Sequence, residues 1–451
     1  MLGLLSEKAC CRDYHEGLLG LLADADSEVH DLILKEHQRL HETLQLGAAE
    51  NRCSRAVLAA LGSVIQNKTA EGFPGARFHG GCTVIDDVEK LAVVRAKKAF
   101  KAQYANVQPH SGTTANQIVI SAVLDKGDKI LSMALDQGGH YSHGSSNSFT
   151  GKFFNAESYY LDSKSFLLDY DFIRQRALEV RPKLIICGAS VYPRTIDFAK
   201  FREIADEVGA LLLADISHIS GLVIAGAHPS PIDHAHFTTT STYKSGGPRG
   251  GLILMGKEWH RKISVDGSEA ELWQHIEHMT FPGMQGTPYL NNIAGKAVFF
   301  KETLSDEYRA RQFKIVENAK SLADNLSGMG YDVVTGGTDN HMILINVVNF
   351  KEGLSGTAAQ RCLEDCGIVV DRARLPYDAM PPELASGVRL GTHIVTRNGM
   401  GLKEMDSISE LFNGVLKRVE VRGDVGYYLE ESFREDKKRQ VRDLCQKFPI
   451  H

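Results

Sequence analysis

The sequence predicts an α/β fold built on a mostly parallel sheet, followed by a smaller α+β domain. Between about residues 129 and 256, short β-rich runs alternate with amphipathic stretches, which is typical of parallel strands joined by crossover helices. Beyond about residue 306, the pattern changes to a long helical stretch followed by further strands. The chain has 451 residues, of which 43% are hydrophobic and 24% charged. This is an ordinary globular composition in a chain long enough for more than one domain.

The strands expected in the first domain cover residues 129–135, 183–189, 211–215, 236–242 and 251–256. The connection at 197–209, DFAKFREIADEVG, has its apolar residues on one helical face and ends at a glycine suited to a left-handed cap. We therefore expect a crossover helix there. Ligands of open parallel sheets collect beyond the carboxyl ends of the strands, so polar residues just after these strands are candidates for a site.

The second domain is expected to contain strands at YDVVT, ILINVV and GIVVD, a helix between them, the SGVRLGT segment and a helical tail. The charged stretch REDKKRQVRD in that tail is interpreted as a solvated helix face. We predict a join of one continuous helix near 300–325. The predicted division is a helical N-terminal arm over 1–45, a large domain over 46–310 and a small domain over 311–451. The arm either wraps a partner or lies back on its own subunit.

Charge and composition exclude several classes of protein. The 51 Lys and Arg residues nearly balance 56 Asp and Glu residues, so nothing favours a nucleic-acid or membrane-surface partner. The N-terminus does not resemble a secretory signal, and no run approaches the roughly 18 apolar residues of a membrane span. We therefore expect a cytoplasmic protein. The eight cysteines are scattered, and Cys362 and Cys366 lack the further ligands of a zinc site, so we expect no metal.

Three features at helix starts and strand ends carry chemistry. In NVQPHSGTTANQ, small polar residues from Ser111 precede an apolar helix, which fits either a phosphate cradle or a plain helix cap. Asp215 ends the strand LLLAD, where an acid needs a cation or a donor. Lys244 follows the strand HFTTTST and precedes SGGPRGG; it is either a surface charge or a lysine that forms a Schiff base. A phosphate cradle, a buried acid and a lysine at a strand end are together the groups that a protein needs to bind pyridoxal phosphate.

Ordered segments along nearly the whole chain carry a resemblance to one enzyme family. They include NKTAEGFPGARFHGGC, ANVQPHSGTTANQ, QGGHYSHG, ADISHISG, TTTSTYKSGGPRGGLI, FPGMQGTP, GGTDNH and SGVRLGT. With these segments the chain resembles the serine hydroxymethyltransferases, which are fold type I (aspartate-aminotransferase-like) enzymes dependent on pyridoxal phosphate. The resemblance implies a large domain with a mostly parallel seven-stranded sheet and a smaller α+β C-terminal domain.

The resemblance implies a set of residues that bind the cofactor. Lys244 would form the imine, and Asp215 would pair with the protonated pyridine nitrogen. His140 would lie on the ring face, while His218 and Ser190 would contact the region of the phenolic oxygen. The remaining residues implied to hold the cofactor are Ser111, Gly112 and Thr113 at the phosphate, Thr242, and Gly286 of a neighbouring subunit.

The resemblance also implies residues for the substrate. Arg389, in SGVRLGT, would grip the α-carboxylate of an amino acid, a task suited to its planar two-pronged donor. Glu71, in AEGFPG, would handle the proton of the substrate hydroxyl. His79 and Ser54 complete the predicted substrate-binding set. Since the family completes its site across a two-fold interface, we expect a homodimer or a tetramer of such dimers.

Departures from the family pattern fall on one side of the site. Tyr243 replaces a histidine before the lysine, Thr69 replaces a tyrosine, and Phe78 and His79 replace paired tyrosines. The segment VDRAR, with Asp371, replaces a run that meets the pterin. The changes leave the residues for pyridoxal phosphate intact and alter those for tetrahydrofolate, which is therefore a doubtful second cofactor.

The predicted function is a hydroxymethyltransferase or aldolase that makes or breaks the Cα–Cβ bond of a β-hydroxy α-amino acid. The serine/glycine pair and the α-methylserine/alanine pair are both open, and the sequence around TYKS resembles more closely the branches that act on α-methylserine or catalyse aldolase or transaldolase reactions. A folate-independent aldolase or transaldolase acting on another amino acid is an alternative. A catalytically inactive protein that keeps the fold for binding or regulation is an alternative of a different class.

Overall fold

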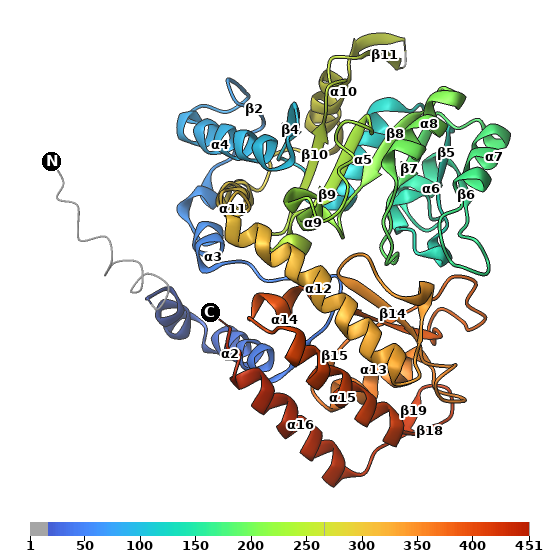
Figure 1. Cartoon of the computed structure of the whole chain (residues 1–451). Coiled ribbons are helices and arrows are strands. Elements are labelled where there is room, and N and C mark those ends of the chain that lie inside the picture. The colour runs from blue at the N-terminus through green and yellow to red at the C-terminus, as the bar shows by residue number, and fades with distance from the viewer. Residues whose placement is uncertain (1–16, 266, 451) are drawn as a thin grey trace.

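The computed structural model describes residues 17–265 and 267–450 (Figure 1). Its largest sheet has seven strands in the order β4-β10-β9-β8-β7-β5-β6. β10 runs antiparallel to both neighbours, and the other pairs are parallel. The strands are β4 (Tyr104–Asn106), β5 (Lys129–Met133), β6 (Asn155–Tyr159), β7 (Leu184–Cys187), β8 (Leu211–Asp215), β9 (Phe237–Ser241) and β10 (Gly251–Met255). The predicted mostly parallel, seven-stranded sheet is confirmed.

The sheet is covered on both faces, which explains why its central strands are apolar throughout. Successive residues of a strand point to opposite faces. Thus Ile185 and Leu212 belong to one apolar cluster, whereas Ile186 and Leu213 belong to another. The second cluster includes α5 (Gly112–Val123). The first includes α4 (Thr83–Phe100), α7 (Tyr170–Val180), α8 (Phe198–Val208) and α11 (Leu290–Glu302).

The crossover helix expected between two strands is confirmed as α8. The Asp197 side chain accepts hydrogen bonds from the N–H groups of Ala199 and Lys200 at its start. Gly209, with φ of 72°, ends the helix in the left-handed conformation that glycine tolerates best. The buried face of α8 includes Phe198 and Phe201. This helix carries the chain from the end of β7 back to the start of β8, whose carboxyl end bears Asp215.

The second domain is built on a four-stranded antiparallel sheet in the order β13-β14-β17-β16. Its strands are β13 (Asp332–Val333), β14 (Met342–Asn346), β16 (Asp371–Ala373) and β17 (Gly387–Gly391). The helices α13 (Gly356–Asp365), α15 (Leu402–Arg418) and α16 (Glu431–Gln446) contribute to the same apolar core. The charged tail segment lies on α16, where only Val441 and Cys445 are buried.

The predicted continuous helix at the join is wrong. The chain forms α11 and then α12 (Asp306–Gly328), with Ser305 between them accepting a hydrogen bond from Tyr308 N at 3.2 Å. The serine side chain satisfies an amide at the start of α12, so a new helix begins there. α12 then spans both domains: Tyr308 and Ile315 pack in the first core, and Leu322 and Leu326 in the second (Figure 1).

The N-terminal arm packs with the second domain of its own chain. α2 (Ser27–Glu42) lies beside α16 (Figure 1). β1 (Leu44–Gln45) pairs in parallel with β15 (Ile368–Val369), and Leu44 and Leu46 are buried in the second core. The first sixteen residues of the predicted arm lie outside the described part of the chain. Among the residues that are described, no helix is both long and apolar enough to cross a membrane.

Candidate active site

A cavity opens beyond the carboxyl ends of β7, β8 and β9, where polar residues follow each strand. Ser190 reaches it after β7, Asp215 at the end of β8, and Lys244 after β9. The start of α5 closes another side. Because parallel strands end at one edge of the sheet, residues far apart in the sequence meet here.

Asp215 is an anion surrounded by donors. Its Oδ2 accepts a hydrogen bond from Asn116 Nδ2 at 2.8 Å and lies 3.0 Å from His143 Nε2. Its Oδ1 accepts hydrogen bonds from Ser217 N at 3.0 Å and Ser217 Oγ at 2.6 Å. Burial alone would raise the pKa of Asp215, but the bonds from His143 and Ser217 outweigh it and hold the pKa well below its usual range. The carboxylate is therefore charged, although it is buried.

Lys244 is buried and lies in a short 3-10 helix of one turn, Tyr243–Ser245. Asn51 Nδ2 donates to its backbone carbonyl at 3.1 Å, which fixes the turn. Its Nζ lies 5.1 Å from the centre of the Tyr243 ring. Within the described chain, no hydrogen bond or ion pair holds this nitrogen. A buried amine without a partner is available to form a covalent bond.

The start of α5 forms a polar cradle. Ser111 Oγ accepts from Thr114 N at 3.0 Å, while the first amides of the helix have no partner within it. A Cβ at Gly112 would lie 3.2 Å from Ser241 N and 3.4 Å from Ser217 Oγ, so a side chain would crowd the cradle. The buried hydroxyl of Ser241 has no hydrogen-bond partner among the described residues. These unpaired donors suit a phosphate group.

Two histidines on the cavity wall are held neutral. Burial, with a smaller contribution from His143, lowers the pKa of His140 to about 4. Burial and the nearby Lys244 hold the pKa of His218 well below its ordinary value. The His140 Nδ1 lies 2.7 Å from Ser142 Oγ and accepts from Ser142 N at 3.2 Å, which fixes its ring. A neutral imidazole held in this way can stack on an aromatic ring.

Arg389 approaches the cavity from the second domain. Its Nη1 donates to the Ser190 carbonyl at 2.7 Å, and its Nη2 pairs with Asp371 Oδ2 at 2.8 Å. Asp371 stands directly opposite it in the register of β16 and β17. The buried Nε of Arg389 has no partner in the described structure. The guanidinium thus retains a free donor, while one prong is held by an internal carboxylate.

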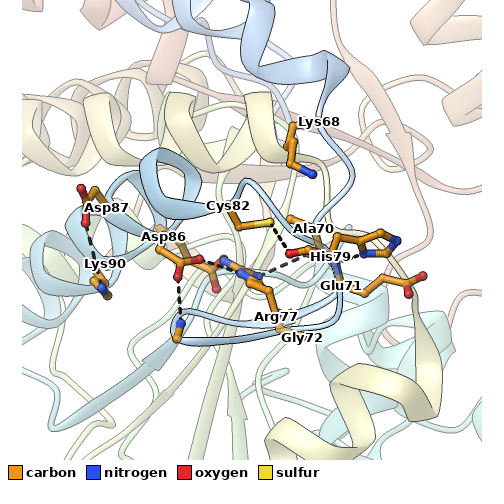
Figure 2. A network of polar contacts seen from close by, with 12 residues as sticks. Lys68, Ala70, Glu71, Gly72, Arg77, His79, Cys82, Asp86, Asp87 and Lys90 are labelled. Carbon is orange, nitrogen blue, oxygen red and sulfur yellow. Dashed lines mark hydrogen bonds and ion pairs between the residues drawn. The ribbon is translucent and has the colours of Figure 1, made fainter.

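Six of the predicted residues are not among those that line this cavity: Arg389, Glu71, His79, Gly286, Ser54 and Thr242. Figure 2 shows Glu71 and His79 on the loop beside Arg77, with the Glu71 side chain pointing away from Arg77. Gly286 is next to Glu71, because a Cβ at Gly286 would lie 2.9 Å from Glu71 Oε1. His79 Nδ1 accepts from Glu71 N at 3.4 Å. Glu71, His79 and Gly286 thus form one group outside the cavity of their own chain.

Ser54 and Thr242 form hydrogen bonds within the protein and do not line the cavity. Ser54 Oγ accepts from Val57 N at 3.1 Å, which begins α3 (Arg55–Leu61), and it also donates to Glu302. Thr242 Oγ1 donates to the Pro248 carbonyl at 2.6 Å. Both hydroxyls therefore form hydrogen bonds away from the cavity, and their contacts with substrate and cofactor stay predictions.

Sequence reasoning missed several cavity residues. Asn116 and His143 hold Asp215 from positions 99 and 72 residues away, and such contacts have no local sequence signal. Arg249 lines the cavity and stacks on Tyr243, with its guanidinium carbon 4.1 Å from the ring centre. In SGGPRGG, an arginine among glycines has the sequence pattern of an exposed loop residue, so the pattern alone does not indicate a cavity position.

A family model described as serine hydroxymethyltransferase matches residues 22–412. The matched span includes the whole seven-stranded sheet, every residue discussed around the cavity, and the strand that bears Arg389.

Proposed function

Because the chain belongs to the serine hydroxymethyltransferase family, we propose that its cavity makes or breaks the Cα–Cβ bond of a β-hydroxy α-amino acid. The family uses pyridoxal phosphate, so the protein is an enzyme of the hydroxymethyltransferase type that depends on this cofactor. The amino acid is the proposed part: serine and glycine, or α-methylserine and alanine. The observation that carries the proposal is the anionic Asp215 in the same cavity as the unpartnered Lys244 nitrogen.

The residues of the cavity fit the cofactor. Lys244 would bind its aldehyde, and Asp215 would face its pyridine nitrogen. The unpaired amides at the start of α5 and the Ser241 hydroxyl would take its phosphate, with His140 against the ring. When bound, pyridoxal phosphate supplies an aldehyde that condenses with amines and a ring that accepts electrons from a breaking bond at the α-carbon.

Arg389 would orient the amino acid. A carboxylate held by a planar, two-pronged donor has few orientations, so the arginine decides which bond at the α-carbon is broken. The unpartnered Nε and the partly exposed Asp371 support this role, since a substrate carboxylate would supply the acceptor that the Nε–H donor lacks. Glu71 would take the proton from the β-hydroxyl, so that the departing carbon leaves as an aldehyde.

Glu71 and Gly286 would act in the site of a second copy of the chain. They lie together and away from the cavity of their own chain. One face of the neighbouring α4 bears exposed apolar residues: Val84 is 70% exposed and Val94 61%. Contiguous exposed apolar residues mark interaction surfaces, and the opposite face of α4 is already buried. A homodimer with shared sites accounts for both features; a tetramer of such dimers is compatible with them.

A folate-independent aldolase or transaldolase is the second candidate. The observation in its favour is that Phe78, which replaces a family tyrosine, is 80% exposed, and that the ring of its neighbour His79 is engaged with the Glu71 amide. Asp371 further adds a carboxylate beside the arginine proposed to bind the substrate. These changes lie where the family contacts folate and leave the cofactor residues in place.

A ligand screen tests the proposal. The protein loaded with pyridoxal phosphate is mixed with glycine, both alanine enantiomers, serine, α-methylserine and threonine, each with and without tetrahydrofolate. We expect a saturable change in the visible absorption of the bound cofactor with at least one of them. Enhancement by tetrahydrofolate would select the folate-dependent reaction, and its lack would select the second candidate. A loaded protein that responds to none of these amino acids contradicts both.

A further inference from the structure

Lys296 is a buried cation outside the cavity that has no role in the chemistry described above. It lies on α11 and is only 1% exposed. Its Nζ donates to three backbone carbonyls: Val107 at 2.6 Å, Gly251 at 2.7 Å and Pro109 at 3.4 Å. No carboxylate pairs with it in the described chain. A lysine is rarely buried completely, and one that bonds only to carbonyls calls for an explanation.

Its three partners belong to the two segments that build the phosphate cradle. Val107 and Pro109 lie on the segment that leads from β4 to Ser111. Gly251 begins β10 directly after Gly250, which lines the cavity. The two segments are also joined by Gly251 N, which donates to the Pro109 carbonyl at 2.8 Å. Lys296 therefore ties both cradle segments together from behind.

Gly250 brings the ammonium close to the cavity. A Cβ at Gly250 would lie 2.4 Å from Lys296 Cε and 2.7 Å from its Nζ, and the φ of 154° also disfavours other residues. Gly250 thus touches Lys296 on one side and lines the cavity on the other. Any side chain at this position would displace the lysine or fill the space between it and the cradle.

The hydrogen bonds favour the charged form of Lys296. Burial lowers its pKa to about 7, and Glu89 partly counteracts this. A neutral amine has only two N–H groups, whereas three carbonyls accept from this nitrogen. The other titratable group that responds to it is His110 on the cavity wall, whose pKa is lowered by burial first and by Lys296 to a smaller extent. A positive charge held in a dry interior acts on a nearby anion far more strongly than one in water.

We propose that Lys296 is a positioning residue for the phosphate of the cofactor. The Lys296 ammonium holds the carbonyl oxygens of both cradle segments turned away from the phosphate, so that amides and hydroxyls face the phosphate. The positive charge of Lys296 also favours the dianionic form of the phosphate. This inference rests on the proposed placement of pyridoxal phosphate in the cavity. It predicts that Lys296 strengthens the binding of ligands that carry the phosphate group and does not alter how the pyridine ring is bound.

The test compares two ligands that differ only in the phosphate. Apo-protein is titrated with pyridoxal phosphate and with pyridoxal, and binding is followed by absorbance, for the wild type, Lys296→Met and the control Lys301→Met on the exposed side of the same helix. We expect Lys296→Met to weaken the binding of pyridoxal phosphate by about tenfold or more, which is the usual size of the effect when hydrogen bonds of a charged group are lost. The affinity for pyridoxal should stay unchanged. The control should match the wild type with both ligands.

A second variant guards against loss of the fold. Lys296→Gln keeps two N–H donors for the carbonyls but removes the charge, and its fold is checked by near-UV circular dichroism. It should show the same selective loss. Equal weakening of both ligands, or no weakening of either, overturns the inference. If the wild type itself binds neither ligand, it is the proposed function that fails.

Discussion

Each residue of the candidate site is held in place by direct contacts with its neighbours. Lys244 and Asp215 could be proposed from the sequence, because Asp215 ends β8, Lys244 follows β9 by three residues, and a charged residue at either place needs a partner. Asn116 could not, although it stands within a predicted helix, because only the folded sheet brings it to Asp215. Ser54 caps a helix, as a serine before a helix often does, and its proposed contact with substrate stays a prediction.

Arg389→Ala tests the residue proposed to orient the substrate. Loss of a partly buried arginine from a charge pair costs about 2–5 kcal/mol of binding, so amino-acid affinity should fall by a factor of about 30 or more. The measurement is the amino-acid dependence of the absorption of the bound cofactor. Asp371→Asn is the matched variant: it keeps the arginine and removes its internal competitor, so the amino acid should bind at least as tightly as in wild type. Unchanged saturation in Arg389→Ala would refute the role.

Whether a strand or helix could be predicted from the sequence depended on how much of it is buried. The central strands of the large sheet were recognisable because both of their faces are covered, whereas the edge strands β4 and β6 were not among those expected. β4 has three residues, and β6, NAESY, alternates polar and small residues, as suits an edge with a partly exposed face. The break between α11 and α12 had a signal in Ser305 followed by two acids, which is typical of a helix start.

Three histidines from different elements form a buried stack beside the cavity. His218 follows β8, His341 precedes β14, and His393 begins α14 (His393–Arg397). The ring centres lie 6.1 Å apart between the first pair and 3.9 Å apart between the second. Burial lowers the pKa of His393 to about 4 from 6.5. The unfolded chain therefore takes up the proton first as the pH falls.

Between pH 6.5 and 4 the His393 imidazole is protonated in the unfolded chain but neutral in the folded protein. The free energy of unfolding is therefore undiminished by this group above pH 6.5 and falls as the pH is lowered toward 4. His393→Phe keeps an aromatic ring in the stack without a titrating group. We expect it to reduce the loss of unfolding free energy between pH 7.5 and pH 5 by about 2 kcal/mol, as measured by urea denaturation at both values. The control His234→Gln, at an exposed histidine, should leave that loss unchanged. An identical loss in His393→Phe and wild type would contradict this account.

The arrangement of the whole molecule explains why part of the site stays apart. The family resemblance pointed to Glu71 and Gly286 and implied that Gly286 acts from a neighbouring subunit, but it did not say in which copy Glu71 acts. Their position outside the cavity of their own chain, together with the exposed apolar residues of α4, fits a site completed by a second copy. Two chains would then each lend a carboxylate to the other.

A mixed dimer of two inactive variants tests this sharing. Lys244→Ala and Glu71→Gln chains are co-expressed with different tags, and the mixed dimer is purified and assayed. If Glu71 acts in the partner's site, one of the two sites contains both wild-type residues, so activity returns to about half of the wild-type value. If Glu71 acts within its own chain, each chain lacks one residue and the mixed dimer stays inactive. The two parental homodimers serve as controls.

The central claim is that Lys244 binds pyridoxal phosphate in a cavity where Asp215 keeps its charge. The most direct measurement is borohydride reduction of the protein incubated with pyridoxal phosphate, followed by digestion and mass mapping of the modified peptide. The account predicts a single stoichiometric modification at Lys244, loss of the visible absorption on reduction, and no modification of Lys244→Ala. Modification at a different lysine, or none at all, would contradict it.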